Sequence, residues 1–273
     1  MRPVGNSFGY SSYHNKLLQI ILPMTHRFIL YAYPDWLPAG RRIRIYLAEK
    51  RISPSLVYVA ESDEDVKAKG YPPKRGNFSP IMAISRPDKP TEYIWVEQSS
   101  AMLEMLEDYC DANSDASPVP SFRGPEDDII RRAMIRGVLY WADTLFELFA
   151  VNAAFGSETI ARARGTTANQ RTAKDMEAAV RFRVLEPLEK VLPEVADFSG
   201  IAEGKEGAMT IADIALFASW EYCAGLCGKD PLSGYPNFSR FIDACRRRKI
   251  LPKEEYPALV KGFALGWLDN VWD

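Results

Sequence analysis

Hydrophobic positions in the first part of the chain fall into four short runs, separated by polar stretches that contain Pro, Gly, Asp or Lys. The runs are rich in aromatic and β-branched residues, which is typical of strands. They cover residues 27–33, 55–60, 81–85 and 91–97. We therefore predict four strands in this part of the chain.

Two helices are predicted among these strands, because apolar residues recur there at helical spacing. In residues 41–50 the apolar positions share one face, and Arg41, Arg42 and Glu49 are expected on the solvent side. Residues 99–110 form the second helix, and the polar segment between the second and third strands holds at most a short one. This order gives a parallel strand pair joined by a helix, then a hairpin and a closing helix, which is a small α/β layer structure.

The second half of the chain shows only helical periodicity, after a linker rich in Asp, Ser, Pro and Gly. Helices are predicted at residues 126–155, 168–192, 210–226 and 235–249. Pro187 should bend the second of them, because proline removes a helical hydrogen bond. The third is apolar on nearly all sides, so it should lie at the centre of a helical bundle.

These patterns divide the chain into five segments. The first is an extension that lacks Asp and Glu; it is predicted to be disordered, with a weak organelle-targeting signal as the alternative. The last is an aromatic segment expected to pack back on the body. The segments are the extension 1–24, an α/β unit 25–112, a linker 113–125, an all-helical unit 126–250 and the C-terminal segment 251–273.

Composition argues against several functions. With 34 Lys and Arg against 36 Asp and Glu, the formal net charge is −2, so no nucleic-acid partner is expected. No apolar run is long enough to predict a membrane span. Two histidines, His14 and His26, are too few for a zinc cluster or a Ser-His-Asp triad. Four cysteines without a Cys-x-x-Cys pair favour a reduced, cytoplasmic protein with no metal.

Three local motifs carry candidate chemistry or structure. Residues 78–81 (FSPI) place a proline at the start of a strand; a trans bond simply opens the strand, whereas a cis bond turns the Ser79 backbone toward an extended ligand. Residues 98–99 (QS) stand where a strand passes into a helix, and Ser99 either caps that helix or helps its N-terminus to bind a carboxylate. Residues 210–213 (TIAD) form a capping box, which is structural.

Together and in this order, these motifs resemble the glutathione S-transferase family. The shared pattern is a proline at the third strand, a [E/Q]-S-x-A-[I/M] step into a helix, a Pro-rich linker, a capping box and a later Tyr-Pro-x-[FL] motif. It covers residues 27–249. The resemblance implies a thioredoxin-like α/β N-terminal domain and an all-α helical-bundle C-terminal domain, with glutathione as co-substrate or cofactor and no metal.

The resemblance also implies roles for four residues. Pro80 corresponds to the family's cis-proline, and the backbone of Ser79 would pair with the cysteinyl part of glutathione. Ser99 and the helix N–H groups would hold the α-carboxylate of the γ-glutamyl end, while the Gln98 side-chain carbonyl would accept from the α-amino group. Many members carry Glu or Asp at the position of Gln98, so this amide is expected to hold the ammonium group less strongly.

The resemblance does not fix the residue that activates the thiol. Leu37 falls where members carry a catalytic Ser or Cys, and a leucine can neither donate a hydrogen bond nor form a disulfide. Tyr33 has the spacing from Arg44 found in the Tyr-type enzymes, so it is the candidate catalytic residue. Alternatively Tyr33 packs in the core, and then Tyr31 points the same way, because alternate strand residues share a face. Backbone N–H groups near Leu37 or Ala39 would then be the only local donors.

Three functions remain open from the sequence. The first is a transferase that conjugates glutathione to an apolar electrophile, bound between the domains near Tyr140 and Trp141 on an aromatic helix face that includes Phe146 and Phe149. The second is a glutathione-dependent isomerase, in which the thiolate adds to a conjugated double bond and leaves after rotation. The third is a non-catalytic protein that keeps the fold for binding. The resemblance by itself implies a homodimer.

Overall fold

The computed structural model describes most of the chain. The described residues are 28–33, 37–76, 79–86, 88–124, 127–156, 158–163, 165–192, 209–227 and 234–248. The predicted disordered extension 1–24 and the C-terminal segment 251–273 both lie outside them, so these two predictions stay predictions.

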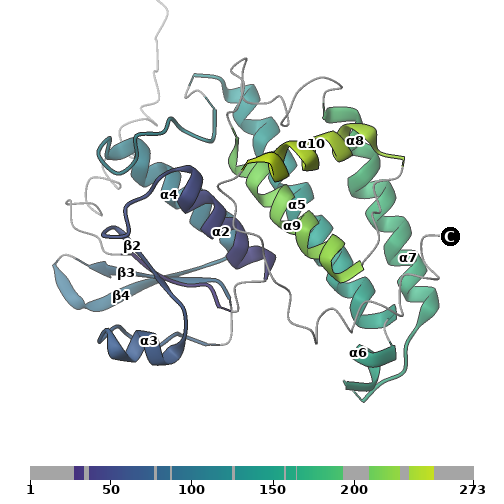
Figure 1. The fold of residues 1–273 in the computed structure, drawn as a ribbon, viewed down its shortest axis with the longest axis horizontal. Helices are drawn as coiled ribbons and strands as arrows, with labels where there is room; N and C mark the ends of the chain where they lie inside the picture. Colours follow the sequence, from purple (N-terminus) through teal and green to yellow (C-terminus); the bar gives the residue numbers. More distant parts are fainter. Residues whose placement is uncertain are drawn as a thin grey trace, which may run out of the picture.

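A mixed four-stranded sheet forms the first half of the fold (Figure 1). Its strands are β1 (Phe28–Tyr31), β2 (Val57–Ala60), β3 (Ile81–Arg86) and β4 (Lys89–Glu97), in the spatial order β2-β1-β3-β4. Strand β1 is parallel to β2 and antiparallel to β3, which is antiparallel to β4. The predicted parallel pair and hairpin are therefore confirmed.

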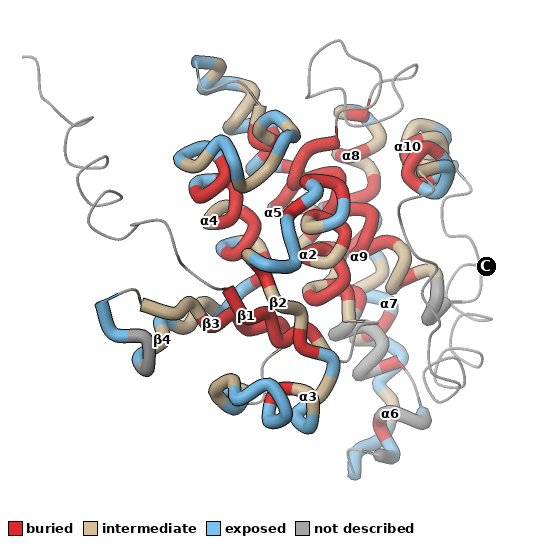
Figure 2. The backbone as a smooth tube through the Cα atoms, turned by 60° about the vertical axis from the view of Figure 1, so that its left-hand side comes forward, coloured by how far each residue is buried: buried red, intermediate tan, exposed pale blue. Residues whose placement is uncertain are grey.

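Helices cover both faces of this sheet (Figure 2). Helices α2 (Pro38–Glu49) and α4 (Ser99–Ala112) lie on one face, and the short α3 (Asp63–Ala68) lies on the other. Successive residues of β1 alternate between the two sides: Phe28 and Leu30 join the large core, while Ile29 and Tyr31 join a smaller cluster on the α3 side. This alternation follows from the pleat of a strand.

Helix α2 begins at Pro38, three residues before the predicted start. Proline suits the first turn of a helix, where its missing N–H has no helical partner. The turn into α2 also brings Gly40 against β1: a Cβ at Gly40 would lie 3.3 Å from the Cβ of Ala32. The sequence pattern missed this turn because Pro and Gly usually mark loops.

The second half is helical throughout the residues that the structure describes. Its elements are α5 (Ile129–Gly156), α6 (Glu158–Ala163), α7 (Gln170–Val180), η1 (Arg181–Leu185), α8 (Glu186–Val191), α9 (Ile211–Cys227) and α10 (Pro236–Arg247). The distortion predicted at Pro187 takes the form of η1, a π-helical segment directly before the α8 turn that holds this proline. A wider turn accommodates a residue that lacks an N–H and crowds the preceding carbonyls.

Helix α9 is central, as its apolar sequence predicts. Every residue from Ile211 to Trp220 is buried, and α9 packs against α5 and α2. The predicted capping box is present at its start: Asp213 N donates to Thr210 Oγ1 (3.1 Å), and Thr210 N donates to Asp213 Oδ2 (2.8 Å). These bonds satisfy backbone groups that the first helical turn leaves without partners.

The prediction that Arg41, Arg42 and Glu49 face solvent is wrong. All three side chains are buried, because α9 packs over the polar side of α2, while Asp143 of α5 and Arg248 after α10 pair with its charged side chains. Arg41 Nη2 lies 3.1 Å from Glu221 Oε2, and Glu49 Oε2 lies 2.5 Å from Arg248 Nη2. The prediction failed because periodicity alone predicts one buried face for a helix, whereas α2 is covered on two sides.

Candidate functional site

The sequence motifs meet at one end of the sheet. Ile81, the first residue of β3, is paired with Tyr31 at the end of β1 and with Glu97 at the end of β4. The residues just before Ile81 and just after Glu97 therefore lie side by side, next to the segment that leaves β1. This arrangement brings together Ser79-Pro80, Gln98-Ser99 and the start of α2.

The Ser79–Pro80 peptide bond is cis, as the resemblance implies. Both ladders of β3 begin at Ile81, so the N–H and C=O of Ser79 take part in neither. The buried Ser79 hydroxyl oxygen also has no hydrogen-bond partner within the described part of the chain. Ser79 can thus offer its backbone to an extended ligand, since the sheet does not use it.

Ser99 does not cap α4. It is the first helical residue, and Gln98 occupies the N-cap position without a side-chain cap hydrogen bond. The first backbone hydrogen bond of the helix runs from Met102 N to Gln98 O (3.1 Å), so the N–H groups of Ser99, Ser100 and Ala101 have no intrahelical acceptor. An uncapped helix N-terminus of this kind attracts a carboxylate or phosphate.

The backbone of Gln98 is strained. Its φ is 70° and its ψ is 111°, a backbone conformation that residues other than glycine rarely adopt. Among the described residues, only Arg51 is another non-glycine residue with positive φ. Strain of this sort tends to occur at ligand sites, where the surroundings hold the backbone in place.

The start of α2 offers no side-chain donor at Leu37. Leu37 is the N-cap of α2 and makes no side-chain cap bond, and the following Pro38 has no N–H. The N–H groups of Ala39 and Gly40 come next in the first turn, where helical N–H groups lack intrahelical acceptors. A ligand atom at this helix end would meet backbone donors rather than a hydroxyl or a thiol.

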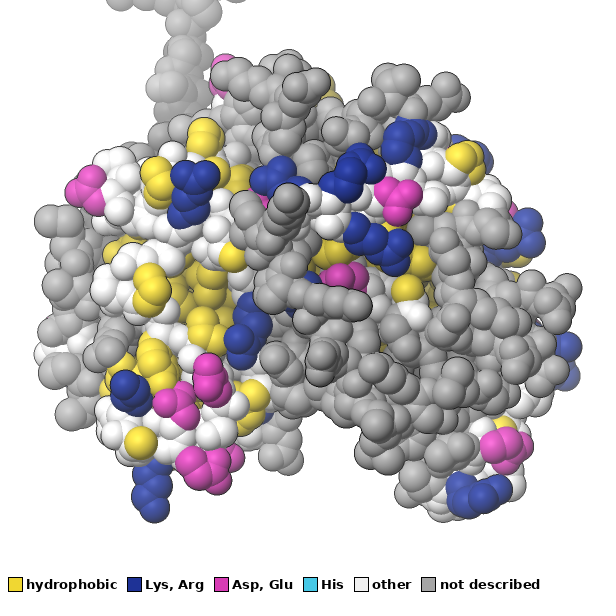
Figure 3. Space-filling model, viewed as in Figure 1, with side chains coloured by type: hydrophobic (Ala, Val, Ile, Leu, Met, Phe, Trp, Pro, Cys, Tyr) yellow, Lys and Arg dark blue, Asp and Glu magenta, His cyan; other side chains and the backbone are white. Residues whose placement is uncertain are grey.

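Tyr33 and Tyr31 both lie toward the α3 side of the sheet. The Tyr33 hydroxyl donates to Asp63 Oδ1 (2.5 Å), and the Lys74 ammonium lies 4.9 Å from the centroid of the Tyr33 ring. Burial, and then the bond to Asp63, raise the pKa of Tyr33. The buried Tyr31 hydroxyl donates to the Pro72 carbonyl (2.5 Å). Acidic side chains gather over α3 beside these groups (Figure 3).

The predicted aromatic residues of the helical unit are dispersed around α5. Tyr140 is 68% exposed, and Phe149 is part of the buried core. Trp141 packs partly against the core. Phe146 instead forms an edge-to-face pair with Tyr222 of α9, with ring centroids 5.6 Å apart. The structure therefore joins Phe146 to a residue that the sequence pattern did not single out.

Sequence reasoning also missed a polar cluster between the two halves. It consists of Arg42, Ser100, Asp143 and Ser219, which come from α2, α4, α5 and α9. One signal was available: Ser219 and Glu221 are polar residues inside a nearly continuous apolar helix. A polar side chain in such a helix needs a partner, because burying it alone is costly.

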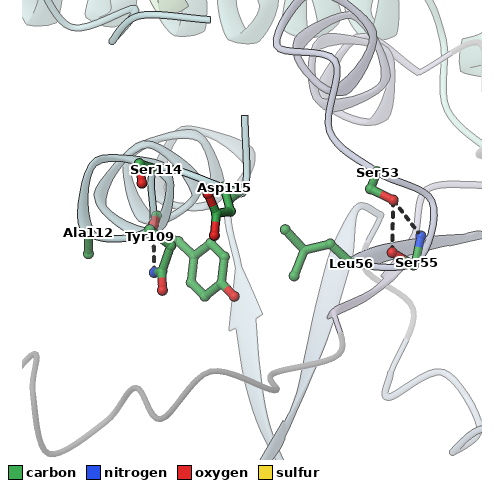
Figure 4. Close-up of a pocket in the computed structure, with 9 residues that line it drawn as sticks. Ser53, Ser55, Leu56, Tyr109, Ala112, Ser114 and Asp115 are labelled. Atoms are coloured by element: carbon green, nitrogen blue, oxygen red, sulfur yellow. Dashed lines mark hydrogen bonds between the residues drawn. The ribbon is translucent and has the colours of Figure 1, made fainter. Parts of the chain in front are cut away.

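A separate pocket of about 450 Å³ lies at the other end of α4 (Figure 4). Leu56 and Tyr109 face each other across it, and Ser55 and Asp115 also line it. Helix α4 has 14 residues, and at about 1.5 Å per residue the pocket is roughly 20 Å from Ser99. It is therefore not part of the candidate site.

The described residues contain no group of three or more His, Cys, Asp or Glu side chains that could hold a metal ion. Cys110, Cys223 and Cys245 are buried and form no disulfide within the described residues, and burial raises the pKa of the Cys110 and Cys245 thiols. Within the same residues, no helix has the length and apolar character needed to cross a membrane.

Comparison with known proteins identifies the fold. No protein-family model and no curated protein sequence matches the chain, but many solved structures do. A glutathione S-transferase from Rhodospirillum rubrum has a TM-score of 0.54 and 18% identity, covering 86% of this chain and 99% of its own. A maleylacetoacetate isomerase from Anaeromyxobacter dehalogenans, with glutathione bound in its active site, has a TM-score of 0.54 and 19% identity, covering 84% and 94%.

A glutathione transferase family member from Pseudomonas fluorescens, with two glutathione molecules bound, has a TM-score of 0.56 and 18% identity, covering 87% of this chain and 92% of its own. The chain therefore has the glutathione S-transferase fold: a thioredoxin-like α/β domain followed by a helical domain. The expected fold class is confirmed. At these identities the likeness establishes the fold and not the activity.

Proposed function

We propose that this protein binds glutathione at the end of the sheet where Ser79-Pro80 and Gln98-Ser99 meet. The observation that carries the proposal is the uncapped N-terminus of α4 beside the unpaired backbone of Ser79. The Ser79 backbone pairs with the cysteinyl part of the ligand, as an added strand. Ser99 and the free N–H groups hold the γ-glutamyl carboxylate, and the Gln98 carbonyl accepts from the α-amino group.

The reaction we propose is transfer of glutathione to an apolar electrophile. Phe146 and Tyr222 are candidates to contact this second substrate, because they are partly exposed aromatic residues in contact between α5 and α9. They lie one turn beyond Asp143 and Ser219, since residues at i and i+3 are neighbours on a helix face. Tyr140 and Trp141 stay predictions for contacts to the second substrate.

Tyr33 is the proposed donor to the glutathione sulfur. A free thiol has a pKa of about 8.5, and a hydrogen bond donated to sulfur favours the thiolate. The raised pKa of Tyr33 keeps its proton available at neutral pH. To act in this way, the Tyr33 hydroxyl must exchange its bond to Asp63 for one to sulfur. The backbone N–H groups of Ala39 and Gly40 are the alternative donors.

Binding without turnover is the second candidate function. Two observations favour it. The side chain of Leu37, at the N-cap of α2, has no hydrogen-bond donor, and the Tyr33 hydroxyl already donates its hydrogen bond to Asp63. Isomerisation of a conjugated double bond is a further alternative, since it needs the same thiolate. Mass spectrometry separates the three: conjugation consumes glutathione, isomerisation changes the substrate without consuming it, and binding alone does neither.

Calorimetric titration with glutathione tests the site itself. Ser99→Ala removes one hydrogen bond to a charged group, so we expect about tenfold weaker binding or more. Ser114→Ala is the matched control, because it removes an exposed hydroxyl beyond the opposite end of α4. A folded Ser99→Ala protein with unaltered affinity for glutathione shows that the site is wrongly assigned.

We also propose that two copies associate through α5. Ile130, Met134 and Gly137 recur at helical spacing and are all exposed, and an exposed apolar stripe on a helix commonly marks an interface. The acidic side chains of α4 nearby, Glu104, Asp108 and Asp111, already pair with Arg123 of the same chain, and Glu104 also pairs with Arg136 of α5. The proposed interface therefore rests on the exposed apolar stripe, which a two-fold axis would bring against its own copy.

A further inference from the structure

The Arg42 guanidinium joins four helices at a buried position. Its side chain is 1% exposed and forms an ion pair with Asp143 of α5. It also donates to Ser100 Oγ of α4 (3.2 Å) and to Ser219 Oγ of α9 (3.2 Å). Ser100 Oγ in turn donates to Asp143 Oδ2 (2.7 Å), so Arg42, Ser100 and Asp143 form a closed ring of hydrogen bonds.

This ring acts on the first turn of α4. Ser100 follows Ser99 directly, and both belong to the turn whose N–H groups lack acceptors. No side chain caps this turn, and its N-cap residue Gln98 is held at a strained φ of 70°. Without a cap, the turn needs another anchor to keep its N–H groups in one direction. The bonds of Ser100 to Arg42 and Asp143 supply such an anchor.

We infer that Arg42 and Asp143 are positioning residues for glutathione, which they fix through Ser100 and the first turn of α4 without touching the ligand. The inference rests on the proposed glutathione site. A site that is already ordered loses less conformational freedom when the ligand binds. Weakening the ring therefore lowers affinity for glutathione, and it does so through Ser99.

The same cluster extends to the proposed aromatic contacts. Asp143 precedes Phe146 by three residues on α5, and Ser219 precedes Tyr222 by three on α9, so each pair shares one side of its helix. Arg42 bonds to Asp143 and Ser219 together. It thereby fixes the spacing of α5 and α9 one turn from the Phe146–Tyr222 pair and ties both to the helix end that bears Ser99.

A double-mutant cycle measures whether Asp143 acts through Ser99. Glutathione affinity is determined by calorimetry for wild type, Ser99→Ala, Asp143→Asn and the double variant. Asp143→Asn keeps the size of the side chain and removes its charge. We expect each single change to weaken binding at least fivefold, and the double variant to fall well short of the product of the two factors, because coupled residues are not additive. A purely structural role gives the full product.

Glu49→Gln provides the matched control. It breaks another buried ion pair of α2, with Arg248, at the opposite end of the helix from the α4 N-terminus. We expect it to lower the free energy of unfolding and to leave glutathione affinity unchanged. Equal losses of affinity in Glu49→Gln and Asp143→Asn contradict the inference, because general loosening of the two halves would then explain both.

Ser100→Ala covers the case in which Asp143→Asn does not fold. It removes only the hydroxyl that bonds α4 to both Arg42 and Asp143, and we expect about threefold to tenfold weaker binding. The two proposals fail in different ways. No binding of glutathione by wild type overturns the proposed function and this inference with it. A second outcome overturns only the inference and leaves the proposed function intact. In it, Ser99→Ala weakens glutathione binding, but Asp143→Asn and Ser100→Ala leave the affinity unchanged.

Discussion

The ammonium group of Lys50 lies 3.0 Å from Glu107 Oε1, and neither side chain is exposed to solvent by more than 1%. Lys50 also donates to the carbonyl oxygens of Val119 (3.2 Å) and Pro120 (2.7 Å), so all three of its protons have acceptors. Glu107 accepts from the Tyr46 hydroxyl (2.7 Å). The linker is thus fastened to the end of α2 and to α4 by one buried ion pair.

Lys50→Met should destabilise the protein strongly. It leaves Glu107 as a buried charge without its counter-ion, and loss of one partner from a buried pair typically costs about 3–5 kcal/mol. Urea denaturation gives the free energy of unfolding. Lys89→Met is the control, because its pair with Glu92 is about half exposed and should be worth less than about 1 kcal/mol. A loss below that value for Lys50→Met means that Glu107 finds other compensation.

Gln98→Gly should stabilise the fold while weakening glutathione binding. Glycine adopts positive φ without steric cost, and relief of this strain is worth up to about 1 kcal/mol. Arg51→Gly is the matched control: its φ is 55°, and it lies at the end of α2 away from the candidate site. Both variants should resist denaturant better, and only Gln98→Gly should lose affinity. Equal affinities would remove Gln98 from the site.

Tyr33→Phe should raise the thiol pKa of bound glutathione toward its free value. The change keeps the ring and removes only the donor, so binding should be nearly unchanged and turnover slower. Ultraviolet absorbance of the thiolate, followed against pH, gives the thiol pKa. Tyr31→Phe is the control, because it removes a hydroxyl that donates to Pro72. If both variants leave the thiol pKa and rate unaltered, the donors are the backbone N–H groups of α2.

Tyr58 should titrate well above an ordinary tyrosine. Its hydroxyl lies 2.6 Å from both carboxylate oxygens of Asp65; this bond, followed by burial, raises the pKa of Tyr58 from 10.0 to about 12. Because the folded-state pKa is the higher one, the stabilising contribution is complete below pH 10 and is lost as pH rises through about 12. Urea denaturation across this range should show a smaller loss in Tyr58→Phe than in wild type.

The bond between Tyr58 and Asp65 also makes stability depend on pH in the acid range, through the carboxyl group of Asp65. The bond from Tyr58 lowers the pKa of Asp65 below 3.8, so its contribution is present above that pH and lost as pH falls further. In Tyr58→Phe the carboxyl pKa of Asp65 should rise, which NMR titration can detect. An Asp65 titration that is identical in both proteins contradicts the bond.

Met134→Glu should disrupt the proposed homodimer. Met134 is exposed on the apolar stripe of α5, and a charge there is costly to bury between two copies. Sedimentation equilibrium at micromolar concentration should give twice the chain mass for wild type and a lower mass for the variant. Phe182→Glu is the control, since it places a charge at another exposed apolar residue, in η1. A wild-type monomer ends this proposal.

The sequence by itself determined the order and kind of most elements. Alternation and length predict β1 to β4, and helical spacing predicts α2, α4, α5, α9 and α10, because these signals are local. The capping box of α9 and the proline at the start of β3 are local as well. The step from β4 to α4 at Gln98-Ser99 is also predicted locally, because the spacing of apolar residues changes there from strand alternation to helical periodicity.

Only the tertiary structure decided how the candidate site is built around these motifs. Whether Ser99 caps its helix depends on the backbone of Gln98, and the Tyr33 hydroxyl meets Asp63 because α3 crosses the same side of the sheet. The burial of Arg42 depends on helices about 100 and 175 residues further along the chain. Within a short stretch of sequence, helical periodicity predicts that a charged residue on the polar face of a helix is exposed to solvent. The partners that bury it come from distant segments, and their approach is set by packing rather than by local pattern.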